Sequence, residues 1–341
     1  MLALLAARSR LLAALRTADE HRALSEARRL IDGGMSLSAL LLDVIAPVQD
    51  DIGKLWQEAR LSIAEEHVAT LISERVIALA SIPADSTTAS PSRGYVVVAC
   101  VEGEFHTMPA RILTEVLRVH GWHTTFLGAS MPTDYLVTYV EQNRPSAVGL
   151  SCTLSSNLPR AHKAITACGE LGMAVFVGGR GFGSQGQWAR SLEVTTWAAD
   201  ALNALGVIDQ IHADWSPSPS SARGADTEYA SLRAMRSELF STALSALDAY
   251  FPLTSDDDPR YDTAVDDLSH TLDFLAAAVY LDEPGLFTEF LAWTAEVRLS
   301  REISLRTIPH ALGALEPALD NCPRTAAIVD EGQRLYAQLN H

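Results

Sequence analysis

A loop in the middle of the chain carries the residues best suited to chemistry. Glu104 and His106 lie two positions apart, just after the apolar run at 95–101. If that run is a buried parallel strand, the loop lies at its carboxyl end, where the ligands of such sheets collect. Glu104 is then placed to accept the proton of one ring nitrogen of His106, which fixes the tautomer and strengthens the other nitrogen as a metal ligand. A loop histidine that only hydrogen-bonds to a neighbouring acid is the alternative interpretation.

Small residues follow two later apolar runs in the same part of the chain. Ser151 and Thr153 end the run at 146–152, and Gly178 and Gly179 end the run at 173–179. Glycine at a strand end lets backbone or ligand approach closely, because it has no Cβ atom. These two strand ends, together with the loop at 102–109, are expected at one edge of the predicted sheet.

The three motifs, in this order, resemble the cobalamin-binding domain of methionine synthase and its relatives over residues 92–212. That family carries Asp-x-His-x-x-Gly, then Ser-x-Thr or Ser-x-Leu, then a Gly-Gly pair. The resemblance implies that His106 is the lower axial ligand of cobalt and that Glu104 and Phe105 belong to its loop. It also implies that Ser151, Thr153, Gly178 and Gly179 line the displaced nucleotide tail.

Two positions depart from the family pattern. Glu104 stands where the family has Asp, which keeps the carboxylate acceptor with a longer reach. Pro109 stands where the family has Gly, which constrains the loop backbone and puts the geometry of the tail in doubt.

The first third of the chain contains a second group of chemically suited residues. Trp56 precedes Glu66 by ten residues, and His67 follows directly. This spacing resembles the helical cap of light-responsive cobalamin regulators of the CarH type. The resemblance implies that Trp56 and Glu66 hold the adenosyl group of adenosylcobalamin, by stacking and by accepting ribose hydroxyls. It also implies that His67 reaches cobalt from above after photolysis. Alternatively, Trp56 and His67 are ordinary residues of a helix bundle and Glu66 is solvated.

The last third of the chain gives a weaker indication. The order of helical cap, cobalamin domain and helical domain resembles the layout of the photocobilins, which carry cobalamin and a linear tetrapyrrole. That layout implies a globin-like pocket for a bilin such as biliverdin, with His270, Trp293, Arg298 and Arg301 as residues of suitable type. Against this, His270 lies off the apolar stripe, and arginines near helix ends are usually solvated. A dimerisation or partner-docking module is the other interpretation.

The periodicity of apolar residues predicts the elements that position these groups. Residues 1–85 and 226–341 favour helices, and residues 92–212 alternate short apolar runs at 95–101, 124–128, 146–152 and 173–179 with helical segments. The prediction is an N-terminal helical bundle, a Rossmann-like domain with a parallel sheet, and a C-terminal helical domain. Ser- and Pro-rich stretches at 81–94 and 215–228 are predicted linkers.

Apolar residues at helical spacing form four predicted stripes. They are Leu37, Leu40, Leu41, Val44, Ile45 and Val48; Ile63, Val68, Leu71, Ile72 and Val76; Val265, Leu268, Leu272, Leu275 and Val279; and Leu286, Phe290, Trp293 and Val297.

Composition bounds the class of protein. The 341 residues carry a formal net charge of −16, which argues against direct binding to nucleic acid. No apolar run is long enough to span a membrane. Four well-separated cysteines indicate a reducing cytoplasm rather than a disulfide framework.

The sequence predicts a non-enzymatic photoreceptor that uses adenosylcobalamin, with biliverdin as a second chromophore still open. We expect a homo-oligomer or a downstream signalling partner. The alternatives are a corrinoid carrier for methyl transfer and a cobalamin sensor that does not use light.

Overall fold

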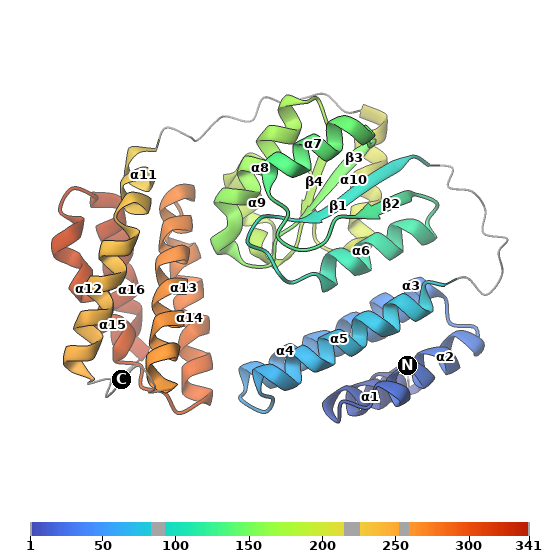
Figure 1. Cartoon of the computed structure of the whole chain (residues 1–341), viewed down its shortest axis with the longest axis horizontal. Coiled ribbons are helices and arrows are strands. Elements are labelled where there is room, and N and C mark those ends of the chain that lie inside the picture. The colour runs from blue at the N-terminus through green and yellow to red at the C-terminus, as the bar shows by residue number, and fades with distance from the viewer. Residues whose placement is uncertain (1, 83–92, 215–225, 252–258, 340–341) are drawn as a thin grey trace. The chain divides into compact units, whose positions relative to one another are not determined.

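The computed structural model describes residues 2–82, 93–214, 226–251 and 259–339 (Figure 1). The chain divides into two compact units, one made of Met1–Thr153 with Arg160–Ser220 and one made of Ser221–His341 with Leu154–Pro159. The predicted fold class is confirmed: helices come first, then a parallel α/β sheet, then helices again. The core of both predicted linkers lies outside the described residues, and the predicted three-domain division stays a prediction.

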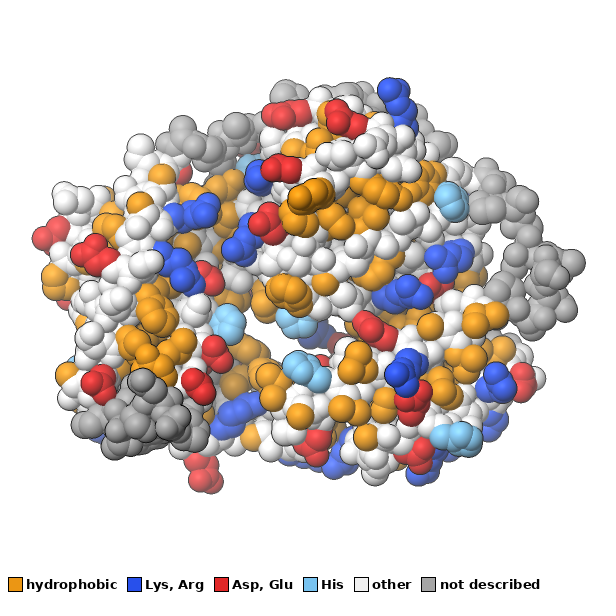
Figure 2. Space-filling view, in the orientation of Figure 1, with side chains coloured by type: hydrophobic (Ala, Val, Ile, Leu, Met, Phe, Trp, Pro, Cys, Tyr) orange, Lys and Arg blue, Asp and Glu red, His pale blue; other side chains and the backbone are white. Residues whose placement is uncertain are grey.

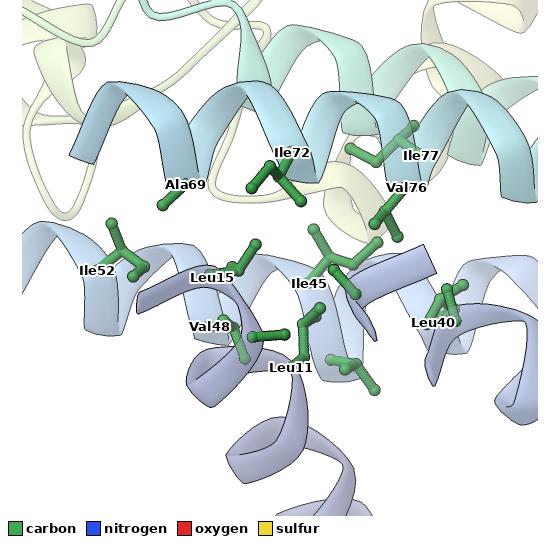
Figure 3. Close-up of a cluster of buried hydrophobic side chains, with 14 of the residues drawn as sticks. Leu11, Leu15, Leu40, Ile45, Val48, Ile52, Ala69, Ile72, Val76 and Ile77 are labelled. Atoms are coloured by element: carbon green, nitrogen blue, oxygen red, sulfur yellow. The ribbon is translucent and has the colours of Figure 1, made fainter. Parts of the chain in front are cut away.

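The first unit begins with a helical bundle. Its elements are α1 (Leu2–Arg16), α2 (Glu20–Asp32), α3 (Leu37–Ala39), the π-helical η1 (Leu40–Ile45), α4 (Ala46–Gln57) and α5 (Ile63–Ala80). Leu11 and Leu15 of α1 pack between the η1–α4 helix, with Ile45 and Val48, and α5 (Figure 3). The predicted stripe at 37–48 is buried from Leu40 onward, and it forms the centre of this bundle.

The π-helical turn of η1 has a clear cause in the sequence. Pro47 has no N–H, so it cannot donate to the carbonyl of Asp43 as an α-helix would require. Arg8 of α1 donates its Nε to that carbonyl instead, at 2.6 Å. The N–H of Ala46 bonds to the carbonyl of Leu41, five residues back, which is the π-helical pattern.

The second predicted stripe is only half right. Ile72 and Val76 of α5 are buried, but Ile63 is 62% exposed and Leu71 is 59% exposed. Val68 is also exposed, and hydrophobic side chains reach the molecular surface at several places in the space-filling view (Figure 2). An amphipathic helix normally buries its apolar residues, so α5 carries an apolar face that its own bundle does not cover.

The sheet has five parallel strands in the order β2-β1-β3-β4-β5. The strands are β1 (Tyr95–Cys100), β2 (His123–Phe126), β3 (Ala147–Ser151), β4 (Val175–Gly178) and β5 (Trp197–Ala198). Four of them were predicted. The two-residue β5 was not, because so short a strand leaves no apolar run to detect.

Helices cover both faces of the sheet (Figure 1). They are α6 (Met108–Val119), α7 (Thr133–Asn143), α8 (Leu158–Glu170), the short α9 (Gln187–Ser191) and α10 (Ala201–Asp214). A 3₁₀ turn, η3 (Arg180–Phe182), follows β4, and the 3₁₀ turn η2 (Ser155–Asn157) belongs to the second unit. Helix α6 has a second role, because Met108, Ile112 and Val116 belong to the hydrophobic core of the N-terminal bundle. The bundle is therefore attached to the sheet domain along α6.

The second unit is helical. It contains α11 (Thr227–Ala234), α12 (Arg236–Tyr250), α13 (Pro259–Leu281), α14 (Pro284–Ser300), α15 (Thr307–Leu315), the 3₁₀ turn η4 (Glu316–Leu319) and α16 (Pro323–Leu339). Helices α14 and α16 approach closely at Gly332, where a Cβ atom would lie 2.6 Å from Cδ1 of Leu291. Among the described helices, none is long and apolar enough to cross a membrane.

One predicted stripe of this unit is wrong in part. Trp293 is 42% exposed, whereas Arg298 is buried on the inner face of α14. The charge is tolerated there because the Arg298 guanidinium bonds to Asp267 of α13, to the Ser304 carbonyl and to Thr307. Burial raises the pKa of the Asp267 carboxyl, and the Arg298 charge opposes that rise.

Candidate functional site

The loops after β1, β3 and β4 meet at the carboxyl edge of the sheet. The chain runs from β1 outward to β2 and then returns to β3 on the other side, so β1 and β3 flank the point where the strand order reverses. Crevices at such a point are the usual ligand sites of open α/β sheets. All three predicted strand-end motifs lie at this edge.

Glu104 ties two of these loops together. Its side chain is fully buried, and its Oε1 accepts from Nδ1 of His106 at 2.6 Å and from the backbone N–H of His106 at 2.9 Å. Its Oε2 accepts from the backbone N–H of Thr153, after β3, at 2.6 Å. The longer side chain of Glu, where the related family has Asp, thus spans both loops at once.

The ring of His106 is held in one tautomer. Because the Glu104 carboxylate accepts from Nδ1, the proton is on Nδ1 and the lone pair is on Nε2. The His106 side chain is 54% exposed. The hydrogen bond to Glu104 raises the pKa of His106, burial opposes this, and the charges of Glu104 and Glu66 add to the rise. An accessible Nε2 lone pair backed by a carboxylate is the arrangement of a metal-binding histidine.

The cysteines near this loop are buried thiols with raised pKa values. Burial, with a smaller contribution from the Glu104 charge, raises the pKa of the Cys100 thiol to about 12. The same two causes raise the pKa of Cys152. Burial therefore favours the neutral thiol over the thiolate at both positions.

The other strand ends form a narrow cradle. Gly179 has φ +105, and a Cβ atom there would lie 2.3 Å from the Cys152 carbonyl oxygen. A Cβ on Gly178 would lie 3.2 Å from the Ala198 carbonyl oxygen. Ser151 is buried, and the buried Oγ1 of Thr153 has no hydrogen-bond partner among the described residues. A hydroxyl of this kind beside close-packed backbone fits the polar tail of a ligand, because buried polar groups are normally satisfied.

The predicted cap residues gather at one end of the α4–α5 hairpin. Trp56 is in the last turn of α4, and Glu66 and His67 are in the first turns of α5. A capping box fixes where α5 begins: Ser62 Oγ accepts from the Glu65 N–H, and the Glu65 carboxylate accepts from the Ser62 N–H. The His67 side chain is 68% exposed and lies 3.7 Å from the Glu66 carboxylate.

One face of α5 turns toward the His106 loop. Glu74, two turns after His67, accepts a hydrogen bond from Thr107 Oγ1 at 2.7 Å. The rise of an α-helix places His67 about 10 Å further along the axis from that contact. The Glu66 charge acts on His106, and the exposed Ile63 and Leu71 share this face.

Sequence reasoning missed four residues of this region as site residues. Thr107 and Glu74 join the loop to the bundle, and Arg180 after β4 pairs with Asp50 of α4. A motif gives no signal for such pairs, since the partners are far apart in the sequence. Phe105 was predicted, and the structure leaves it 72% exposed beside His106.

The four predicted bilin residues have different surroundings. His270 on α13 and Trp293 on α14 are exposed, and Arg301 donates to the Val297 carbonyl. Arg298 is committed to the buried network with Asp267. The bilin site stays a prediction.

Comparison with known proteins defines the class to which this site belongs. Residues 94–206 match a B12 binding domain family, and residues 7–80 match a second family also described as a B12 binding domain. The chain is therefore a cobalamin-binding protein, and its sheet domain and N-terminal bundle are the parts that carry the match. Three features of the site fit cobalamin. They are the buried Thr153 hydroxyl without a partner among the described residues, the close-packed backbone at Gly179, and the His106 tautomer with an accessible Nε2.

Individual relatives are similar to parts of the chain. The chain is 30% identical to the HTH-type transcriptional repressor CarH of Myxococcus xanthus over 143 residues, which are 40% of this chain and 46% of that protein. It is 22% identical to dimethylamine corrinoid protein 1 of Methanosarcina acetivorans over 184 residues, 52% of this chain and 85% of that one. The chain thus spans about half the length of the repressor that it matches.

A solved structure also resembles the chain. It is the monomethylamine corrinoid protein of Methanosarcina barkeri, at a TM-score of 0.48 and 13% identity, over 58% of this chain and 95% of that one.

Proposed function

We propose that the chain is a non-enzymatic light receptor that binds adenosylcobalamin between its sheet edge and its N-terminal bundle. Two features together carry this proposal. The Nε2 atom of His106 is accessible and its ring is held by buried Glu104, and the N-terminal bundle has a face that carries Glu66 and His67. The similarity to the repressor CarH supports a regulatory role.

Each residue has one task in this proposal. Adenosylcobalamin, when bound, supplies a cobalt–carbon bond that light can break. His106 would hold the cobalt through Nε2, and Glu104 holds the His106 ring in the tautomer that leaves this nitrogen free. Trp56 and Glu66 bind the adenosyl group, and His67 stands at the same end of the bundle, exposed and able to turn.

A corrinoid carrier for methyl transfer is the second candidate. It is favoured by the similarity to dimethylamine corrinoid protein 1, most of whose length this chain covers. A cobalamin sensor that does not use light is the third. Absorbance of the purified holoprotein before and after green illumination separates them. A light-induced spectral change with release of an adenosine derivative supports the receptor, and an unchanged spectrum rejects it. Exchange of a methyl group with a methyltransferase supports the carrier.

Two expectations need their own tests. The net charge predicts no direct binding to nucleic acid, whereas one relative is named a transcriptional repressor. A gel-shift assay with genomic fragments tests this expectation. Binding of biliverdin to the second unit is tested by an absorbance titration of the holoprotein.

Trp56→Ala should lower the affinity for adenosylcobalamin more than the affinity for methylcobalamin. A stacked aromatic contact contributes about 1 kcal/mol beyond area burial, so the difference should be about fivefold. Trp56→Phe, which keeps an aromatic ring, is the matched control and should show a smaller difference. Equal losses for both cofactors would make Trp56 a structural residue of the bundle.

His67→Ala should change the absorbance spectrum of the illuminated protein and leave the spectrum in darkness unchanged. The reason is that the exposed His67 imidazole could bind cobalt, whereas alanine could not. His21→Ala on α2 is the control, since that helix is not part of the α4–α5 hairpin. Identical illuminated spectra for wild type and His67→Ala would reject this role.

A further inference from the structure

Besides the hydrogen bond from Thr107 to Glu74 at the start of α6, the N-terminal bundle meets the sheet domain through two kinds of contact. The first is apolar: Met108, Ile112 and Val116 of α6 are part of the core of the bundle. All three are buried, so little of this seam is open to water. Contacts of this kind do not open reversibly without exposing a large apolar area.

The second contact is ionic and open to water. Arg180 Nη2 donates to Asp50 Oδ1 at 2.5 Å, with the Arg180 side chain 77% exposed and the Asp50 side chain 52% exposed. Exposed ion pairs are weak and are screened by salt, so they exchange readily between closed and open states.

These two contacts lie at different strands of the sheet. Helix α6 follows β1, whereas Arg180 follows β4, and β3 lies between those strands. Arg180 also comes directly after Gly179, the residue of the narrow cradle. The loops with His106, Thr153 and Gly179 are therefore flanked by the apolar seam at one strand and the ion pair at another.

We propose that Arg180 and Asp50 form an ionic latch that holds the N-terminal bundle closed over the carboxyl edge of the sheet. The seam on α6 is the hinge, and opening of the latch sets the rate at which cobalamin enters and leaves. The kinetic part of this inference rests on cobalamin binding at the proposed site.

A latch and a cofactor contact give different kinetics. A residue that only gates access changes the association and dissociation rate constants by the same factor, so Kd stays constant. A residue that contacts the bound cofactor changes Kd, mainly through dissociation. The ratio of the two rate constants therefore separates the roles.

Asp50→Asn is the main test variant. Stopped-flow absorbance with adenosylcobalamin should show both rate constants raised by about two- to fivefold, the effect of losing an exposed ion pair, with Kd unchanged. Asp51→Asn is the matched control, because Asp51 pairs only weakly with Lys54 of its own helix, at 3.9 Å. Its rate constants should equal those of the wild type. The charge swap Asp50→Arg with Arg180→Asp should restore the wild-type rates.

A measurement without cofactor tests the latch independently of the proposed function. The four native cysteines are buried, so spin labels can be placed on Glu58→Cys in the bundle and Ser184→Cys in the sheet domain. Asp50→Asn should shift the label-to-label distances of the apoprotein to larger values, and Asp51→Asn should not. Unchanged distances, a changed Kd or a charge swap that fails to restore the rates would overturn the latch. If the label-to-label distances shift but the protein does not bind cobalamin, the latch stands and only the proposed function is rejected.

Discussion

His106→Ala should remove the histidine-ligated absorbance spectrum of bound cobalamin and weaken retention of the cofactor by at least about tenfold. Loss of a residue that merely orients a metal-bound histidine already costs about 10- to 100-fold, and this change removes the ligand itself. Absorbance spectroscopy and gel filtration of the loaded protein measure both effects.

Two further variants make this result specific. Glu104→Gln should give a partial loss, since the NH2 end of an amide cannot accept a hydrogen bond, so that either the bonds from His106 or the bond from the Thr153 N–H is lost. His120→Ala is the control, because the ring of His120 bonds to the Val116 carbonyl at the end of α6, away from the loop. A wild-type spectrum and affinity in His106→Ala would place the lower ligand elsewhere.

Gly179→Ala should destabilise the first unit by about 2 kcal/mol or more and abolish cofactor binding. The backbone at φ +105 disfavours any side chain, and the new Cβ would lie 2.3 Å from the Cys152 carbonyl oxygen. Relief of this clash requires the loops after β3 and β4 to separate, which disrupts the cradle. Urea unfolding gives the free energy, and titration with cobalamin gives the affinity.

Gly172→Ala is the control that isolates the clash. Gly172 also has a positive φ, +73, but nothing lies within 4 Å of the added Cβ. It should cost about 1 kcal/mol for the backbone alone and leave binding intact. Equal effects of the two changes would show that the contact with Cys152 does not matter.

The sheet could be predicted because each buried strand of useful length reads as an apolar run. The runs at 95–101 and 146–152 became β1 and β3, and the glycines at 178–179 end β4 as expected. The hydrogen bond from His106 to Glu104 was predicted as well, since two residues so close in one loop have few other partners. The bond from Thr153 to Glu104 was not, because it depends on β1 and β3 being neighbours.

The helical parts show where periodicity misleads. Apolar spacing predicted Ile63 and Leu71 as core residues, yet both face outward on α5 beside His67. Spacing identifies an apolar face, but it does not say whether protein or ligand covers that face.

Arg298 shows the opposite error. An arginine near a helix end is usually solvated, but this one is buried. Its burial depends on Asp267 in another helix and on Ser304 in the following loop. A pairing of that kind is invisible in the local sequence.

The π-helical turn of η1 determines the direction in which each side chain of α4 points, because α4 continues directly from it. One extra residue in a turn rotates the rest of a helix by about 100° relative to an uninterrupted α-helix. Asp50 and Trp56 both come after this turn. Closing this wide turn into a regular α-helix without a deletion would therefore turn both side chains by about a quarter of a revolution, Asp50 away from Arg180 and Trp56 away from its present side. Deleting a single residue from Leu40–Ile45 would instead remove the extra residue and leave both side chains in their present phase. The insertion that accommodates Pro47 thus also determines which side chains of α4 face the sheet.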